Sequence, residues 1–474
     1  MDATNTTTRP RNDGNLSRRT PVDNKDPDPV MSRLFKMFSN VWSPENEAGI
    51  VNLGVAENSL MADELVEFYR TELANTFDHT GLTYGDNLYA SKRTTLALSG
   101  FLNRHFKPHL PIDPAHIVTG NGVYSLLNHL MHALLDPGEG IILPSPYYLG
   151  FDTMCTKRVG GVLVGVKMDD LVEGQEGSVN VEETITRFEE RLQESEREGV
   201  KIKVLLLTNP GNPIGRTLSR EMLLAYCRFA EKHDLHLISD EVYALSVFEN
   251  DRLPDALPFT SLLNIDLERE LGESFDKKRV HVVHGMSKDF CSNGLRFATL
   301  VSQYNTELHR AMASFGLFIK PSSVSDALLY ALLTAPPPTG DEDLQKDGHA
   351  GSFECYADWF IHTNQRRMRD AYRYMRDRLE RAGLEVVPSH GGHFIWTKVS
   401  KKAGWGSWEG ELDGFGKIFD AGVYIAPGSL FHASTPGHLR FTFTVPRPLS
   451  ELGLDRFEGV HLATSKGSTR DGGE

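Results

Sequence analysis

The chain has 474 residues, a length that suits two domains sharing an interface better than one simple core. Its formal net charge is −14, with acidic and basic residues interspersed, which argues against nucleic acid as a partner. Its four cysteines are too few and too scattered for a disulfide framework or a CxxC zinc site, and no apolar run reaches the roughly eighteen residues that span a membrane. We therefore expect a cytoplasmic protein with no membrane partner.

The N-terminal region divides into a polar arm and a first helical pattern. Residues 1–30 are polar, dotted with proline and without the apolar core of a signal peptide, so we expect a disordered arm. Over residues 31–38, apolar side chains recur at helical spacing. The run VNLGV that follows indicates a strand, and Asn58 or Ser59 can cap the helix that begins near Met61.

The segment HIVTGNGVYSLLNHLM predicts a strand, a glycine turn and a helix. A helix N-terminus after such a turn exposes unpaired N–H groups and the positive end of the helix dipole. Gly122, Val123 and Tyr124 would therefore line a seat for phosphate, with Val123 contributing backbone only. His129 and His132 lie one turn apart on this helix, but a third ligand is missing and we expect no metal site.

Three later strands end in polar residues. KVLLLT leads into the proline-fixed loop NPGNPIG, LHLIS leads into DEVY, and HVVHG leads into MSKDF. Open α/β sheets keep their ligands at the carboxyl ends of their strands, which is where Asn212, Asp240 and Lys288 fall. A partly desolvated amine near other cations loses its proton well below the usual pKa of roughly 10.4 and can form a Schiff base with a carbonyl. Pyridoxal phosphate is held in that way.

The C-terminal third indicates a second, smaller domain. The proline-rich, acidic segment TAPPPTGDEDLQKDGHAGS predicts a loop insertion, and a long helix resumes near Tyr356. GLEVVPSHGGHFIWTKV and AGVYIAPGSLFHASTPGHLRFTFTV alternate like half-buried strands, and Arg440 lies in the second of them.

These motifs, with SPYYLGF, TYGDN and an arginine eight residues beyond Lys288, resemble the fold-type I pyridoxal-phosphate enzymes of the class I/II aminotransferase superfamily. Within it, the chain is most similar to the branch that contains 1-aminocyclopropane-1-carboxylate synthase. The resemblance implies an α/β fold, with a mixed, mostly parallel sheet sandwiched by helices in the large domain and a smaller α/β C-terminal domain. The implied divisions are 1–30 (arm), 31–80 (small domain and dimer contact), 81–325 (large cofactor-binding domain), 326–462 (small domain) and 463–474 (loose tail).

The resemblance also implies how the cofactor ring would be held. Lys288 would bind it covalently, and Tyr148 would stack on it, with Tyr147 as the alternative. Asp240 would pair with the ring nitrogen and keep it protonated. Asn212 and Tyr243 would share the phenolic oxygen.

For the cofactor phosphate, the resemblance implies Ser287, Arg296 and the helix N–H groups. Tyr84 would reach the phosphate from the neighbouring subunit, which implies a homodimer with shared active sites, and in the family the helix at 31–38 also reaches over that subunit. Gly285 and Val123 stand where many relatives carry a hydroxyl. We therefore expect a leaner phosphate cup.

For the substrate, the resemblance implies that Arg440 binds the α-carboxylate of an amino acid and that Glu57 and Asn212 lie beside it. Lys288, once released, would take the Cα proton as general base. Ser59 departs from the glutamine of the plant synthases.

Three functions remain open at this point. Transamination is our first expectation, and carbon–sulfur bond cleavage or aminocyclopropane-carboxylate synthesis is the alternative. A non-catalytic homologue that binds pyridoxal phosphate is disfavoured, because Lys288, Asp240 and Arg440 are all present.

Overall fold

The computed structural model describes residues 29–168, 180–339, 353–399 and 404–467. The arm expected at 1–30 lies almost wholly outside the described residues, as do most of the acidic insertion and the end of the C-terminal tail. Within the described part, no helix combines the length and apolar composition needed to cross a bilayer.

A seven-stranded sheet forms the centre of the large domain, with strand order β2-β8-β7-β6-β5-β3-β4. All neighbours pair in parallel except β8, which is antiparallel to both β2 and β7. The strands are β2 (Ile117–Gly120), β3 (Gly140–Ser145), β4 (Val162–Lys167), β5 (Ile202–Thr208), β6 (His236–Asp240), β7 (Val280–Gly285) and β8 (Ala298–Val301). The expected mixed, mostly parallel sheet is confirmed.

Both faces of this sheet are buried, as parallel sheets require. In β5, Leu205 and Leu207 belong to one apolar cluster, whereas Val204 and Leu206 belong to the other. The first face is covered by α3 (Lys92–Phe106), α7 (Val181–Arg197), α8 (Arg220–Lys232) and α13 (Ser323–Thr334), and the second by α4 (Gly122–Leu134). Because successive residues of a strand point to opposite faces and both faces are buried, the strands have continuous apolar sequences.

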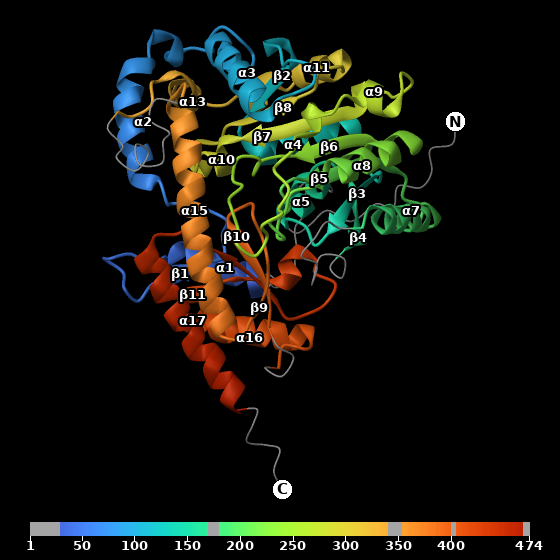
Figure 1. Cartoon of the computed structure of the whole chain (residues 1–474). Helices are drawn as coiled ribbons and strands as arrows, with labels where there is room; N and C mark the ends of the chain where they lie inside the picture. Colours follow the sequence, from blue (N-terminus) through green and yellow to red (C-terminus); the bar gives the residue numbers. More distant parts are fainter. Residues whose placement is uncertain (1–28, 169–179, 340–352, 400–403, 468–474) are drawn as a thin grey trace, which may run out of the picture.

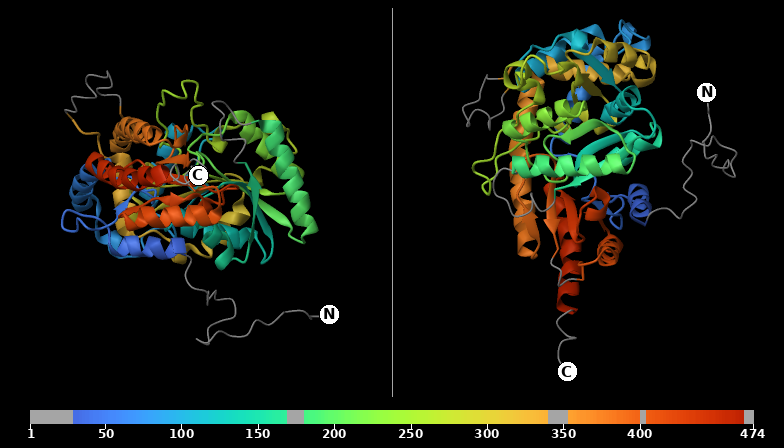
Figure 2. Two further views of the ribbon diagram at one scale, coloured as in Figure 1. Left: turned by 90° about the horizontal axis from the view of Figure 1, so that it is seen from below. Right: turned by 90° about the vertical axis from the view of Figure 1, so that its right-hand side faces the viewer.

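A four-stranded antiparallel sheet, in the order β12-β13-β10-β9, forms the small domain beside a two-stranded parallel pair, β1-β11. The strands are β1 (Val51–Asn52), β9 (Glu385–Val387), β10 (Phe394–Lys398), β11 (Val423–Tyr424), β12 (Ala426–Pro427) and β13 (His438–Thr442). Helices α16 (Trp408–Asp420) and α17 (Arg447–Gly467) pack with them. Figure 1 and the right-hand view of Figure 2 show the large sheet and its helices above this smaller sheet.

Helix α15 (Tyr356–Arg381) runs alongside both domains (Figure 1). Its first half supplies Trp359 and Phe360 to the core of the large domain, and its second half supplies Met368 and Tyr372 to that of the small domain. The boundary expected between residues 325 and 326 falls inside α13, which packs with the large domain. We propose that the division lies within α15 instead.

The N-terminal segment is shared between the domains. Helix α1 (Pro29–Ser39) and β1 lie with the small domain, whereas α2 (Ala62–Thr76) packs on α13. The prediction that Asn58 or Ser59 caps α2 is wrong. The residue that precedes the helix is Met61, and its side chain forms no capping hydrogen bond. Asn58 instead accepts a hydrogen bond from Leu60 N–H (3.0 Å) and donates one to Asn364 (2.9 Å).

Short helical turns complete the described chain. They are η1 (His79–Leu82), η2 (Pro114–His116), α5 (Gly150–Asp152), η3 (Thr153–Lys157), η4 (Leu262–Asn264), α9 (Leu267–Leu271), η5 (Lys277–Arg279), α10 (Met286–Asp289), η6 (Asn293–Leu295), α11 (Thr306–Ala313), α12 (Gly316–Ile319) and η8 (Gly428–Phe431).

Candidate active site

A cavity of about 360 Å³ lies where the carboxyl ends of β5, β6 and β7 and the N-terminus of α4 meet the small domain. The position follows the rule for ligand sites in open α/β sheets. Four charged side chains line it, those of Asp240, Lys288, Arg296 and Arg440.

Lys288 enters the cavity from α10, the single turn that directly follows β7. Its ammonium group donates a short hydrogen bond to Ala56 O. Burial, and then the nearby positive charge of Arg440, lower the pKa of Lys288 to about 8. At this pKa about a tenth of the amine is neutral at pH 7, and the neutral amine is the form that acts as a nucleophile or base.

Asp240 ends β6 and is only 5% exposed. Its carboxylate accepts a hydrogen bond from Val242 N–H (3.3 Å) and forms no ion pair with any residue that the structure describes. Burial raises the pKa of Asp240 to about 7. A carboxylate held in this way is short of partners, and a cationic N–H group placed against it would satisfy it.

Gly122 and Arg296 form an anion cradle at the start of α4. Gly122 has a φ of +80°, which L side chains rarely adopt, and a Cβ at this position would lie 2.2 Å from Arg296 Nη2 and displace the guanidinium. Arg296 also donates to Asn293 O (2.8 Å) and to Ser287 Oγ (3.4 Å). Val123, Tyr124 and Ser287 line the same cavity. The N–H groups of the helix start and the guanidinium suit a phosphate.

The structure also gives a reason for the glycine at 285. A Cβ on Gly285 would lie 2.8 Å from Phe297 O on the adjacent strand, so any side chain there would press on the backbone of β8. A hydroxyl at this position would require the two strands to shift.

Of the two adjacent tyrosines, Tyr148 lines the cavity. Tyr147 points elsewhere: its hydroxyl donates to Asp152 (3.2 Å), and its ring stacks on His432 with 4.3 Å between the centroids. The structure therefore favours Tyr148 over Tyr147 as the residue that contacts a ring in the cavity.

Arg440 comes from β13 of the small domain and is 3% exposed. Its Nη1 donates to Asn212 Oδ1 (3.0 Å) and its Nη2 to Gly54 O, while its buried Nε has no hydrogen-bond partner. The rings of Phe394 and Phe431 lie 5.1 and 4.5 Å from the guanidinium carbon. This cation is desolvated but not neutralised, and it suits a carboxylate ligand.

Three predicted site residues do not line the cavity of this single chain. Gly122 lies at the start of α4, beside Arg296. Glu57 is exposed and accepts a hydrogen bond from Asn293 Nδ2 (2.7 Å). Tyr84 is 81% exposed. Tyr243 and Asn212, by contrast, line the cavity as expected from their motifs.

Sequence reasoning missed a buried carboxylate beside the lysine. Asp289 is 1% exposed and accepts hydrogen bonds from Leu245 N–H (3.0 Å), Ser246 Oγ (2.7 Å) and His284 Nε2 (2.9 Å). These bonds fix the turn that carries Lys288 to the turn that follows β6. The motif SKDF contained the residue, but only its packing reveals the bonds.

Sequence reasoning also missed the apolar side of the cavity. Helix α1, expected to reach over a neighbouring subunit, packs against α16 and β11 of its own chain and places Leu34 and Phe38 in the cavity wall. Val55, Leu149 and Leu430 line the cavity as well. The spacing of Leu34 and Phe38, four residues apart on one helix, was the only available signal.

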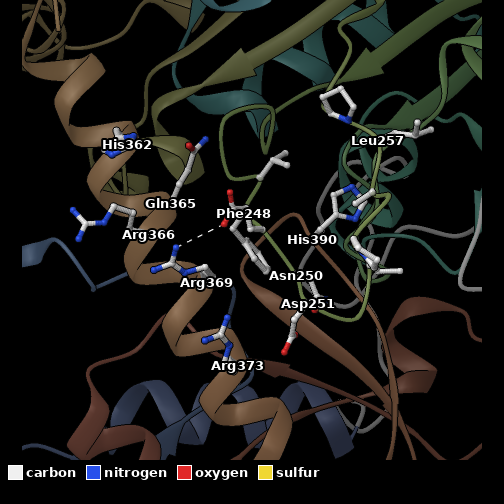
Figure 3. Close-up of a pocket in the computed structure, with 16 residues that line it drawn as sticks. Phe248, Asn250, Asp251, Leu257, His362, Gln365, Arg366, Arg369, Arg373 and His390 are labelled. Atoms are coloured by element: carbon white, nitrogen blue, oxygen red, sulfur yellow. Dashed lines mark ion pairs between the residues drawn. The ribbon is translucent and has the colours of Figure 1, made fainter. Parts of the chain in front are cut away.

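A second, larger cavity of about 890 Å³ lies between α15 and the segment 247–258 (Figure 3). Arg366, Arg369 and Arg373 line it, and Arg369 pairs with Glu249 at 3.8 Å. None of the predicted site residues lines this cavity. The smaller cavity around Lys288 is therefore the candidate active site.

Comparison with known proteins agrees with this geometry. The family model described as aminotransferase class I and II matches residues 48–457. The probable aminotransferase aclI of Aspergillus oryzae is 32% identical over 412 residues, which cover 86% of this chain and 90% of that protein. The human 1-aminocyclopropane-1-carboxylate synthase-like protein 1 is 30% identical and covers 89% of this chain, with 78% of its own length matched.

A plant relative and a solved structure complete the picture. The 1-aminocyclopropane-1-carboxylate synthase 1 of Cucurbita pepo is 28% identical over 86% of this chain and 78% of its own. A mutant of the aspartate aminotransferase of Thermus thermophilus superimposes with a TM-score of 0.69 at 23% identity, covering 94% of this chain and 99% of that one. The predicted fold-type I architecture is thereby confirmed.

Proposed function

The chain belongs to the class I and II aminotransferase family, and on that premise we propose that it is a pyridoxal-phosphate-dependent aminotransferase acting on an α-amino acid. The observation that carries the proposal is the buried amine of Lys288, with its lowered pKa, in one cavity with Asp240 and Arg440. When bound, pyridoxal phosphate supplies an electron sink that makes the Cα–H of the attached amino acid acidic.

The residues of the cavity fit this cofactor. Among the described residues Asp240 forms no ion pair, so its carboxylate would pair with the ring nitrogen and keep that nitrogen protonated. Asn212 and Tyr243 would hold the phenolic oxygen, and Tyr148 would pack against the ring.

The cofactor phosphate would be held by Arg296, Ser287 Oγ and the N–H groups at the start of α4. Gly122 leaves the space for the guanidinium, because its hydrogen stands where a Cβ would meet Arg296.

Lys288 has two tasks. Its amine holds the cofactor, and once the substrate displaces it, the free amine lies beside the Cα–H and accepts that proton. Burial disfavours a lasting positive charge on Nζ, so Lys288 readily releases the proton that it has accepted. Asp289 keeps the turn in place during this exchange.

Arg440 orients the substrate. Its guanidinium pairs with the α-carboxylate, and the rings of Phe394 and Phe431 hold it from the sides. The carboxylate would accept charge-assisted hydrogen bonds from the guanidinium, including one from Nε, which has no partner among the described residues.

The test of the proposal is amino-group transfer. Incubated with pyridoxal phosphate and a panel of amino acids, the protein is expected to need a keto-acid acceptor for continued turnover and to convert the bound cofactor to its amino form when no acceptor is present. The absorbance spectrum and the keto-acid product report both events.

Two other outcomes would contradict transamination. S-adenosylmethionine and cysteine S-conjugates are supplied in parallel without acceptor. Release of methylthioadenosine, or of a thiol with pyruvate and ammonia, faster than amino-group transfer would assign the chain to the synthase or lyase reactions instead.

Substitution of Arg440 separates substrate binding from cofactor binding. Removing one partner of a desolvated charge pair costs about 2–5 kcal/mol, so we expect Arg440→Ala to lower kcat/KM by tens-fold or more with the cofactor absorbance unchanged. Arg440→Lys keeps the positive charge but cannot form the bidentate pair of hydrogen bonds, so its kcat/KM is expected to lie between those of Arg440→Ala and the wild type. Loss of cofactor binding with unchanged substrate affinity would place Arg440 in the phosphate site.

We also propose a homodimer in which Tyr84 completes the phosphate site of the partner subunit. Tyr84 is 81% exposed, and the adjacent Leu82 and Phe318 are 79% and 80% exposed. Lys320 ties the two segments together by donating to Tyr84 O and Asn87 O. Exposed apolar side chains gathered in this way mark an interaction surface.

Complementation tests the shared site. In a mixture of Lys288→Ala and Tyr84→Phe chains after subunit exchange, each mixed dimer holds one site with both native groups if Tyr84 acts on its partner. We expect part of the mixture to regain wild-type cofactor affinity, measured by absorbance titration. No recovery despite proven exchange would place Tyr84 in the site of its own chain.

A further inference from the structure

Beyond the residues that hold the cofactor and the α-carboxylate, most of the cavity wall is aliphatic or aromatic, with Thr208 and Asn293 as polar exceptions. Leu34 and Phe38 come from α1, and Val55 follows β1. Leu149 precedes α5 and Leu430 lies in η8. Five residues from four segments of the chain thus present one kind of surface.

Helix α1 is held so that two of its apolar residues turn toward the cavity. Its Val30 and Met37 are buried against the small domain. Leu34 and Phe38, which share a face at a spacing of four residues, line the cavity. Phe38 is 54% exposed, so a large ring is left open beside the site.

The remaining wall is continuous with this helix. Leu430, like Leu34 and Val55, packs against the buried apolar cluster under α1, and, like Leu149, it packs against the cluster around Trp396. Because Leu430 packs against both clusters, it links the two sides of the apolar wall.

The charged side chains that line the cavity leave none for a charged substrate side chain, and the nearby Glu57 is exposed and already accepts a hydrogen bond from Asn293 Nδ2 (2.7 Å). Of the described residues, those charged and lining the cavity are Asp240, Lys288, Arg296 and Arg440, and each already has a partner in the proposed function. The two cations of α1 point away: Arg33 lies 5.4 Å from the ring of Phe415, and Lys36 lies 5.7 Å from that of Phe419. An ionised side chain against this wall would lose its hydration without gaining a partner.

We propose that the substrate is an amino acid with a large, uncharged, apolar side chain, and that Leu34 and Phe38 contact that side chain together with Leu149 and Leu430. This inference rests on the proposed function in that an amino acid binds beside the cofactor. It deepens that function by naming the class of side chain and the residues that select it.

The test uses amino acids that bind without turning over. α-Methyl amino acids lack the Cα hydrogen, so absorbance titration of the cofactor-loaded protein gives their Kd directly. We expect α-methyl-L-phenylalanine and α-methyl-L-leucine to bind at least about tenfold more tightly than α-methyl-L-aspartate, since apolar pockets discriminate by such factors. Equal or tighter binding of α-methyl-L-aspartate would overturn the inference.

Variants of α1 locate the effect. Phe38→Ala and Leu34→Ala are each expected to weaken the binding of α-methyl-L-phenylalanine by roughly tenfold and to leave that of 2-aminoisobutyrate, whose side chain is a single methyl group too short to reach them, unchanged. Phe35→Ala is the matched control: it makes the same change on the same helix at a residue that is 65% exposed and outside the cavity wall. An equal loss in Phe35→Ala, or no loss in either test variant, would contradict the assignment.

The two proposals fail in different ways. If amino-group transfer is absent but the order of Kd values holds, the reaction type is wrong and the side-chain class stands. If transfer occurs but acidic analogues bind best, the reaction type stands and the apolar wall does not select the substrate.

Discussion

The site depends on one constraint, which is that several charged groups are buried in a cavity that supplies too few partners for them. The amine of Lys288 has a lowered pKa because it is enclosed near two arginines. Asp240 has a raised pKa because it is buried, and its carboxylate accepts a single hydrogen bond from the described residues. Arg440 keeps an unpartnered Nε. Buried charges left in this condition cost stability, and a ligand that carries the complementary groups recovers that free energy on binding.

The fold brings these groups together from distant parts of the chain. Parallel strands β5, β6 and β7 deliver Asn212, Asp240 and Lys288 to one edge of the sheet. Arg440 arrives on β13 of the other domain, and α15 joins the two cores with side chains from its two halves. The reactive amine and the proposed carboxylate site therefore belong to different domains, so their separation depends on how those domains pack.

The sequence predicts those features of the site that depend on short local motifs, and it does not predict those that depend on packing between distant segments. Lys288 and Asp240 lie in short motifs at strand ends, where the sequence alone predicted a ligand site. Both residues line the cavity of the structure. The resemblance named Tyr148 first and Tyr147 as the alternative, but only the structure shows why Tyr147 turns away, because its hydrogen bond to Asp152 is a matter of packing. The apolar wall was not foreseeable either: an apolar residue such as Leu34 has the same helical pattern whether it faces a core or a cavity. Which one it faces is decided by contacts between segments hundreds of residues apart.

The central claim is that the buried amine of Lys288 binds the cofactor covalently. Reduction of the protein with borohydride in the presence of pyridoxal phosphate, followed by tryptic digestion and mass spectrometry, locates the attachment directly. The account predicts one stoichiometric phosphopyridoxyl group, on the peptide 280–296 at Lys288. Labelling spread over surface lysines, or a modified site elsewhere with Lys288 untouched, would contradict it.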